Sequence, residues 1–308
     1  MPRPASRSRG AAGQGTAEPA RRGFLALAAT AAAAMTGCAG PAPGLQAGPA
    51  SASRADGRGS RAGVPAWLLT RRALAQVAAS EPVAAGLARH RVYELLQPGE
   101  RPLGLAGALP AVVFASAAQL ARAVHAMALP AGTQAVLYDP EAWPFTPAGE
   151  QRDPVAATAR AAVAAHAAGL QLIAAPALNL VRVLAAGSTA PRTQLFLELG
   201  LAARFAAHAD MLELQGQSLE RDAAQYAEFA AAAARQARRA GAHAGILAGL
   251  STNPPGGPVT ASQLVAAIRA SAASVDGYWL NIPGRGPRCP ACRPTRAGPG
   301  IATLRTVL

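Results

Sequence analysis

The chain has 308 residues, of which 51% are hydrophobic, 15% charged and 4% aromatic. This length accommodates one large domain or two small ones, and the hydrophobic fraction excludes a chain that is disordered throughout. The formal net charge is +13, and all 29 basic residues are arginine. A positive charge of this size is typical of proteins that bind nucleic acid or an anionic membrane surface.

The excess positive charge lies at the two ends of the chain. Residues 1–79 contain ten arginines and two acidic residues, and residues 284–308 contain five arginines and no acidic residue. Residues 80–283 contain fourteen of each, so this central part is neutral. A nucleic-acid-binding domain carries its basic residues on the folded surface, together with exposed aromatics or a recognition helix. We therefore expect no nucleic-acid partner.

Residues 1–38 have the pattern of an export signal. Arg21 and Arg22 precede Gly-Phe-Leu and an Ala-rich apolar run that ends in Met-Thr-Gly-Cys38. Paired arginines before a short apolar stretch are typical of a twin-arginine (Tat) signal, and the run is shorter than the about 20 residues of a spanning helix. The alternative is a buried Ala-rich helix. The Gly-Cys end resembles a lipobox, which predicts lipidation at Cys38 and a location on the outer face of the cell membrane.

Residues 39–63 are rich in Gly, Ala, Pro, Ser and Arg and show no periodicity. This composition predicts a flexible tether between the membrane and a folded domain. Its arginines could favour anionic lipid, and a solvated tail is an equal alternative. The folded domain is expected over residues 64–308, with a basic C-terminal tail.

Short apolar runs alternate with Ala-rich helical stretches from about residue 90 onward. The runs are Val92–Leu96, Ala111–Ala115, Ala135–Tyr138, Leu170–Ala175, Met211–Gln215, Ala244–Leu250 and Val275–Asn281. Strands that alternate with helices at this spacing predict βαβ units and a parallel sheet. The expected N-caps of the intervening helices are Asp153, Thr260 and Ser218, of which Thr260 begins a capping-box pattern.

Two parallel architectures are compatible with this pattern. A doubly wound nucleotide-binding fold normally has a Gly-rich turn after its first strand, and neither G-x-G-x-x-G nor G-x-x-x-x-G-K-[ST] occurs. A (β/α)8 TIM barrel of about 250 residues fits the length of the expected domain. We therefore predict such a barrel, either regular or irregular, with its eighth strand either absent or hidden near residues 64–87.

The most informative polar pattern is in the run that begins at Met211. Glu213, Gln215 and Gln217 alternate with Leu212 and Leu214, so the two sets point to opposite faces of a strand. If the leucines pack against helices, the Glu and Gln side chains point into the barrel or its mouth. An ionised Glu there costs several kcal/mol unless it is paired or hydrated. We predict a functional role for Glu213; the alternative is a hydrogen-bonded polar residue of the core.

A second polar cluster follows the run that ends at Tyr138. Asp139 and Glu141 share one face of an extended segment, and Trp143 follows on the same face. Paired carboxylates with an aromatic at a strand end suit glycoside hydrolysis, in which one carboxyl group protonates the leaving oxygen and the other attacks or activates water. The alternative is that Asp139 caps a helix or turn and Glu141 pairs with an arginine such as Arg152.

Together these patterns predict one site at the C-terminal ends of the strands, where barrels carry their chemistry. Glu213 is the expected nucleophile or base, and Glu141 or Asp139 the expected general acid. The residues expected to shape the pocket are Trp143, Gln215, Gln217, Asn253, Trp279 and Asn281. The expected ligand is a carbohydrate or another small polar molecule.

The blocks YDPEAWPFTP, ELQGQ, LAGLSTNP and GYWLNIPG resemble those of exported actinobacterial lipoproteins with a glycoside-hydrolase-like TIM barrel. The resemblance covers about residues 90–283 and implies the barrel fold and the position of the site. The D-x-x-D-x-D-x-E strand of classical chitinase-type barrels is absent from the sequence. Since fold alone does not give function, a non-catalytic binding or scaffold lipoprotein is the alternative.

Cysteines and histidines predict no metal site and no cofactor. Cys289-Pro-Ala-Cys292 lies between Arg, Pro and Gly residues without a following helix pattern, so a small disulfide loop is favoured over a redox pair or half a zinc site. The five histidines show no metal-binding spacing, and no G-x-S-x-G motif supports a serine hydrolase.

Overall fold

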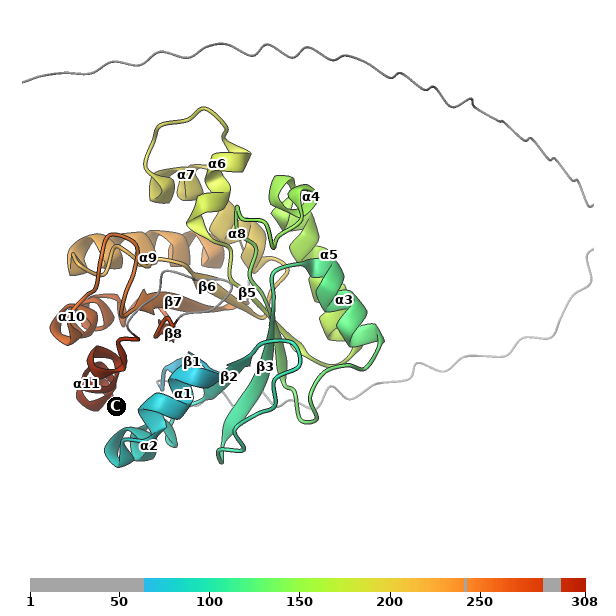
Figure 1. The fold of residues 1–308 in the computed structure, drawn as a ribbon. Coiled ribbons are helices and arrows are strands. Elements are labelled where there is room, and N and C mark those ends of the chain that lie inside the picture. Colours follow the sequence, from blue (N-terminus) through green and yellow to red (C-terminus); the bar gives the residue numbers. More distant parts are fainter. Residues whose placement is uncertain (1–63, 241–242, 285–294) are drawn as a thin grey trace, which may run out of the picture. The chain divides into compact units, whose positions relative to one another are not determined.

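The structure is a computed structural model that describes residues 64–240, 243–284 and 295–308 (Figure 1). Within these residues, eight parallel strands close into a barrel in the order of the sequence, with β8 paired to β1. The strands are β1 Ala66–Thr70, β2 Val92–Leu96, β3 Ala108–Phe114, β4 Ala135–Tyr138, β5 Gln171–Ala174, β6 Met211–Leu214, β7 Gly245–Ser251 and β8 Gly277–Asn281. The predicted (β/α)8 barrel is confirmed, and its eighth strand is β1, inside the range where a hidden strand was expected.

Helices cover the outside of the barrel (Figure 1). They are α1 Arg71–Ala78, α2 Glu81–Leu87, α3 Ala117–His125, α4 Ala148–Arg152, α5 Pro154–Ala167, α6 Val181–Leu184, α7 Arg192–Glu198, α8 Leu201–Ala206, α9 Ala223–Arg239, α10 Ala261–Ser271 and α11 Ala297–Val307, with a short 3-10 turn η1 at Leu178–Leu180. None of the described helices is both long and apolar enough to cross a membrane.

Two of the three expected helix caps are confirmed. The Asp153 carboxylate accepts the Ala156 N–H at the start of α5, and Thr260 forms a complete capping box at the start of α10. The third prediction is wrong. Asp222, not Ser218, caps α9, because a carboxylate directly before the first helical turn accepts its free N–H groups. Ser218 lies outside the helix with φ +91°, a value that residues with a side chain rarely adopt.

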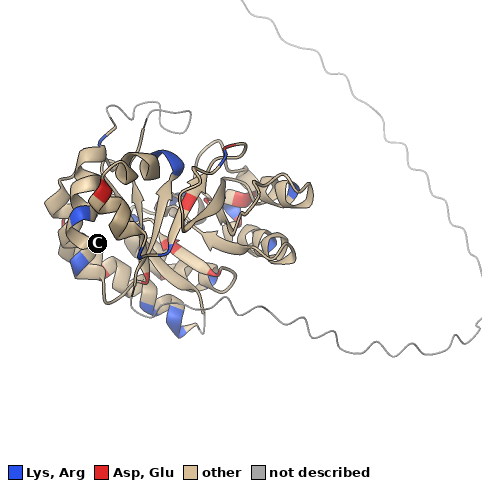
Figure 2. Cartoon of the chain, turned by 90° about the horizontal axis from the view of Figure 1, so that it is seen from below, with Lys and Arg blue, Asp and Glu red and all other residues tan. Residues whose placement is uncertain are grey.

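The C-terminal residues add a helix to the outer layer. Residues 297–307, expected to belong to a basic tail, form α11, and its Leu304 is fully buried. This helix lies against α1, α2 and α10, so it closes the ring of helices between the last and the first strands. In Figure 2 the arginines of the described residues are distributed around the domain rather than gathered on one face.

The interior of the barrel is filled by alternate residues of the strands. Its cluster includes Leu68, Tyr93, Leu95, Ala111, Val113, Ala135, Leu137, Ile173, Ala175, Met211, Leu247 and Trp279. The intervening residues, among them Leu212 and Leu214, pack against the helices. The predicted alternation in β6 is therefore confirmed, and Glu213 belongs to the inward-facing set.

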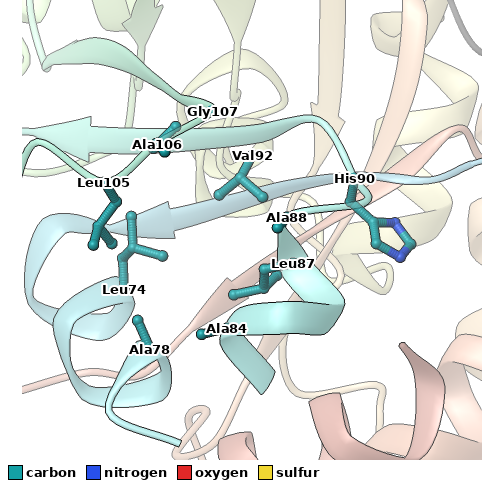
Figure 3. A pocket seen from close by; sticks show the side chains of 11 residues that line it. Leu74, Ala78, Ala84, Leu87, Ala88, His90, Val92, Leu105, Ala106 and Gly107 are labelled. Carbon is teal, nitrogen blue, oxygen red and sulfur yellow. The ribbon is translucent and has the colours of Figure 1, made fainter. Parts of the chain in front are cut away.

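One neighbouring pair of strands lacks a helix. Residues 97–107 join β2 to β3 without helical turns, whereas the connections between the other successive strands all contain helix. An apolar cavity of about 180 Å³ lies at this gap, outside the barrel (Figure 3). Leu74, Leu87, Val92 and Leu105 line it, and His90 is its one ionisable lining residue. This composition offers apolar contact but no set of groups for acid–base chemistry.

Candidate active site at the C-terminal ends of the strands

Glu213 is a buried carboxyl group inside the barrel. Its side chain is 0% exposed, and neither Oε1 nor Oε2 has a hydrogen-bond partner among the described residues. Space for it exists because residue 249 on β7 is glycine: a Cβ there would lie within 3.0 Å of both Glu213 Oε1 and Gln217 Nε2. These two atoms therefore lie within 6 Å of each other, in the same notch over the Gly249 backbone.

The surroundings of Glu213 favour its neutral form. Burial raises its pKa well above the ordinary value of 4.5, and the negative charges of Asp139 and Glu141 raise it further. A carboxyl group with a raised pKa keeps its proton to a higher pH than an ordinary glutamate does and can release it to a bound molecule. Asp139 and Glu141 thus lie close enough to Glu213 to influence its pKa.

Gln215 connects three strand ends. Its Nε2 donates hydrogen bonds to Asp139 Oδ1, at 2.9 Å, and to the carbonyl oxygen of Ala175, at 2.8 Å. These contacts join the segment after β6 to those after β4 and β5. These two hydrogen bonds hold the Asp139 carboxyl group beside the ends of β5 and β6.

The segment after β4 is fixed by a buried threonine. Thr146 Oγ1 accepts hydrogen bonds from the Glu141 N–H, at 3.1 Å, and from Trp143 Nε1, at 2.9 Å. Asn179 joins the same segment from the loop after β5: its Oδ1 accepts the Ala142 N–H at 2.8 Å, and its Nδ2 lies 3.5 Å from Glu141 Oε2. The following helix α4 is preceded by Pro147, so Asp139 does not cap it.

The remaining predicted pocket residues lie at the ends of β7 and β8. Trp279 points into the barrel, and its Nε1 is buried without a hydrogen-bond partner among the described residues. Asn281 is the last residue of β8 and pairs in register with Ser251 of β7. Asn253 follows β7, where its N–H donates to Ser251 Oγ at 3.2 Å. These residues complete the same end of the barrel as the carboxyl groups.

Sequence reasoning missed Glu220, a further buried acid near the site. It is 0% exposed, and its Oε1 accepts the Ser251 N–H at 2.9 Å, while Oε2 has no partner among the described residues. Burial raises its pKa. Its carboxylate ties the loop after β6, which carries Gln217, to the end of β7. No local pattern reveals this role, because Ser251 is 31 residues away in the sequence.

Several predicted residues lie outside the described part of the chain, namely Cys38, Cys289 and Cys292 with the export signal and the tether. Within the described ranges, no group of three or more His, Cys, Asp or Glu side chains is arranged to hold a metal ion.

No protein-family model and no curated protein sequence matches this chain. Among solved structures, it is similar to a GH128 (subgroup I) endo-beta-1,3-glucanase from Amycolatopsis mediterranei in complex with laminaritriose, at 14% identity and TM-score 0.44, covering 79% of this chain and 100% of the other. It is also similar to a chitinase from Chromobacterium violaceum, at 13% identity and TM-score 0.44, covering 80% of this chain and 100% of the other. The similarity to triosephosphate isomerase from Bartonella henselae has 15% identity and TM-score 0.38, and it covers 70% of this chain and 91% of the other.

Proposed function

We propose that this protein binds a carbohydrate at the C-terminal end of its barrel and hydrolyses a glycosidic bond there. The observation that carries the proposal is Glu213, a fully buried carboxyl group without a hydrogen-bond partner among the described residues. Burying such a group costs free energy that a purely structural core would avoid with Val or Ile. Its neighbours Asp139 and Glu141 supply the second carboxyl group that glycoside hydrolysis requires.

The environment of each carboxyl group favours a division of roles. Protonated Glu213 serves as the general acid: its proton goes to the glycosidic oxygen as the bond from that oxygen to the anomeric carbon breaks. Asp139, held by Gln215, or Glu141 then assists the attack of water on the anomeric carbon and takes up the proton of that water. The sequence had favoured the opposite assignment, with Glu213 as nucleophile or base.

Substrate contact requires Gln217 to move. Glu213 is not exposed, and the half-buried Gln217 side chain shares the notch over Gly249 with it. A sugar hydroxyl group that replaces the Gln217 amide would bring the glycosidic oxygen to the Glu213 carboxyl. Rotamer changes of surface side chains are far faster than enzyme turnover, so we expect the movement of Gln217 not to limit the rate.

The variant Glu213→Gln tests the proposal. Release of reducing ends is measured from a panel of neutral polysaccharides (beta-1,3-glucan, cellulose, xylan and chitin) with wild type, Glu213→Gln and the surface control Glu228→Gln on α9. Wild type and the control should release sugar, and Glu213→Gln should lose at least about 100-fold in rate. Equal rates for Glu213→Gln and wild type would show that Glu213 is not the acid.

A non-catalytic carbohydrate-binding protein is the second candidate. The position of the Gln217 side chain beside Glu213 favours this candidate, because a catalytic group must touch its substrate, whereas binding alone does not require Gln217 to move. Binding of the same polysaccharides by wild type without any release of reducing ends would establish this role in place of hydrolysis. Neither binding nor release from any of them would overturn both candidates.

We also propose that the protein is exported and anchored to the outer face of the membrane by a lipid on Cys38. The support is the Arg21-Arg22 signal followed by an apolar run and a Gly-Cys end. The variant Cys38→Ser should move the protein from the membrane fraction to the soluble fraction. Retention of the variant in the membrane fraction would overturn the anchor.

A further inference from the structure

An aromatic pair lies in the segment after β4 that also carries Asp139 and Glu141. The rings of Trp143 and Phe145 meet edge to face, with centroids 5.1 Å apart and planes at 78°. Trp143 is half-buried, whereas Phe145 is 45% exposed. Phe145 is the one aromatic among the large hydrophobic side chains that are exposed in the described residues. An edge-to-face pair leaves one ring face of Phe145 turned away from its partner.

The backbone around Phe145 is held rigidly. Its neighbour Thr146 is buried and accepts hydrogen bonds from Trp143 Nε1 and from the Glu141 N–H. Gln151 Nε2 donates to the carbonyl oxygens of Trp143, at 2.8 Å, and of Thr146, at 2.7 Å. Four hydrogen bonds therefore fix the chain on both sides of Phe145, whose ring is exposed and apolar. A ring that is exposed without a function does not need such support. A ring that is already held in its binding position loses little entropy when a ligand binds.

The same hydrogen bonds also fix where the backbone of Phe145 lies relative to Glu141. The Thr146 hydroxyl group accepts the Glu141 N–H at 3.1 Å, so the residue next to Phe145 is joined to the backbone of a residue that supplies one of the carboxyl groups. A molecule that contacts both must extend from the end of the barrel across the segment after β4. A single sugar bound at Glu213 inside the barrel would leave Phe145 uncovered.

We propose that the Trp143–Phe145 pair is a sugar-stacking surface, and that the ligand is a chain of several sugar units rather than a single sugar. This inference rests on the proposed function and specifies the class of its substrate. The apolar face of a pyranose ring covers an aromatic ring of the size of Phe145, and its hydroxyl groups remain in water. The unit stacked on Phe145 then positions the chain so that a neighbouring linkage lies at the carboxyl groups.

The test uses neutral oligosaccharides of increasing length from the beta-1,3-gluco, cello and chito series, with binding measured by calorimetry. The variants are Phe145→Leu, which keeps an apolar side chain, Phe145→Tyr, which keeps the ring, and Val163→Ala, which removes an exposed apolar side chain from α5. In wild type, affinity should rise about tenfold once the chain reaches Phe145. Phe145→Leu should lose this rise without a change in the affinity for the shortest oligosaccharide, while Phe145→Tyr and Val163→Ala should keep it.

Each alternative result has a definite meaning. Affinity that does not depend on chain length, or an equal rise in Phe145→Leu and wild type, would overturn the stacking surface and leave the proposed function standing. Failure of wild type to bind any of the three series would overturn the proposed function together with this inference. A change of oligomeric state in Phe145→Leu would instead assign the ring to a protein contact and would also overturn it.

Discussion

Glu150 and Glu213 are both buried glutamates, but their surroundings are opposite. Glu150 on α4 accepts hydrogen bonds from Ser116 Oγ at 3.0 Å, from the N–H groups of Ala117 and Ala118 at 2.8 and 3.2 Å, and from Tyr138 Oη at 2.9 Å. Glu213 has no such partner among the described residues. The Glu150 carboxylate occupies the N-terminus of α3, where the helix dipole and the free N–H groups favour an anion.

This difference distinguishes a carboxyl group that stabilises the fold from one that is available to a bound molecule. A carboxylate with four donors stabilises the fold and has no capacity left for a ligand. A carboxyl group without donors destabilises the fold and keeps its full capacity for a bound molecule. We therefore expect the same substitution, Glu to Gln, to harm stability at one position and function at the other.

The largest effect on stability is expected from Glu150→Gln. The new amide can accept fewer hydrogen bonds, and its NH2 group would face N–H donors of α3. We expect the free energy of unfolding to fall by about 3 kcal/mol, as measured by urea denaturation. Polysaccharide cleavage per folded molecule should be unchanged. A loss of less than about 1 kcal/mol would show that the donors do not depend on this carboxylate.

The next largest effect is expected from Gly249→Ala. The added methyl group would occupy the notch that holds the Glu213 carboxyl group and the Gln217 amide, so both side chains must shift. We expect the free energy of unfolding to fall by about 2 kcal/mol and cleavage to fall at least about tenfold. Circular dichroism checks that the barrel remains folded. Full activity in this variant would show that the position of Glu213 is unimportant.

A smaller effect is expected from Thr146→Val. This change preserves the shape of the side chain but removes the oxygen that accepts from Trp143 Nε1 and from the Glu141 N–H. We expect about 1–2 kcal/mol lower stability and weaker binding of long oligosaccharides, since the aromatic pair loses its support. Calorimetry with the oligosaccharide series measures the second effect. Unchanged binding of long chains would argue against a preorganised surface.

The smallest effect is expected from Thr260→Ala, which removes the capping box of α10. Loss of this cap should lower stability by about 1 kcal/mol without any effect on cleavage. Thermal denaturation and the reducing-end assay check the two parts. A loss of activity larger than the loss of folded protein would show that the active site responds to any destabilisation of the barrel.

The sequence predicted much of the barrel and part of the site. Periodicity located β2 and β4 to the residue, because each is a short apolar run between clear breaks. It did not resolve β1, since Ala66–Thr70 runs directly into α1 at Arg71 without an intervening loop. The alternation of polar and apolar residues predicted that Glu213 points into the barrel, because every second side chain of a strand points to the same face.

Long-range contacts could not be predicted in this way. Three of the four donors to Glu150 lie 32 to 34 residues earlier, and Glu220 depends on Ser251, which lies 31 residues later. The hydrogen bond from Gln215 to Asp139 spans 76 residues. Such pairs form only when the barrel closes, and nothing in the local pattern around either residue marks them.

The pH dependence of stability reports on the protonation of Glu213. Because its pKa is raised in the folded protein, the group is protonated there when the unfolded chain already ionises it. The contribution of this proton to the free energy of unfolding is fully present below pH about 4.5 and is lost as the pH rises through the pKa of the folded state. A glutamine at this position has no proton to lose.

The most direct test is therefore the difference in free energy of unfolding between Glu213→Gln and wild type, measured by urea denaturation at pH about 5 and about 8. We predict that the variant is at least as stable as wild type at the lower pH and becomes more stable than wild type at the higher pH. A variant that is less stable at both values, by an amount similar to that of Glu150→Gln, would show that Glu213 is a structural residue and would contradict its proposed role.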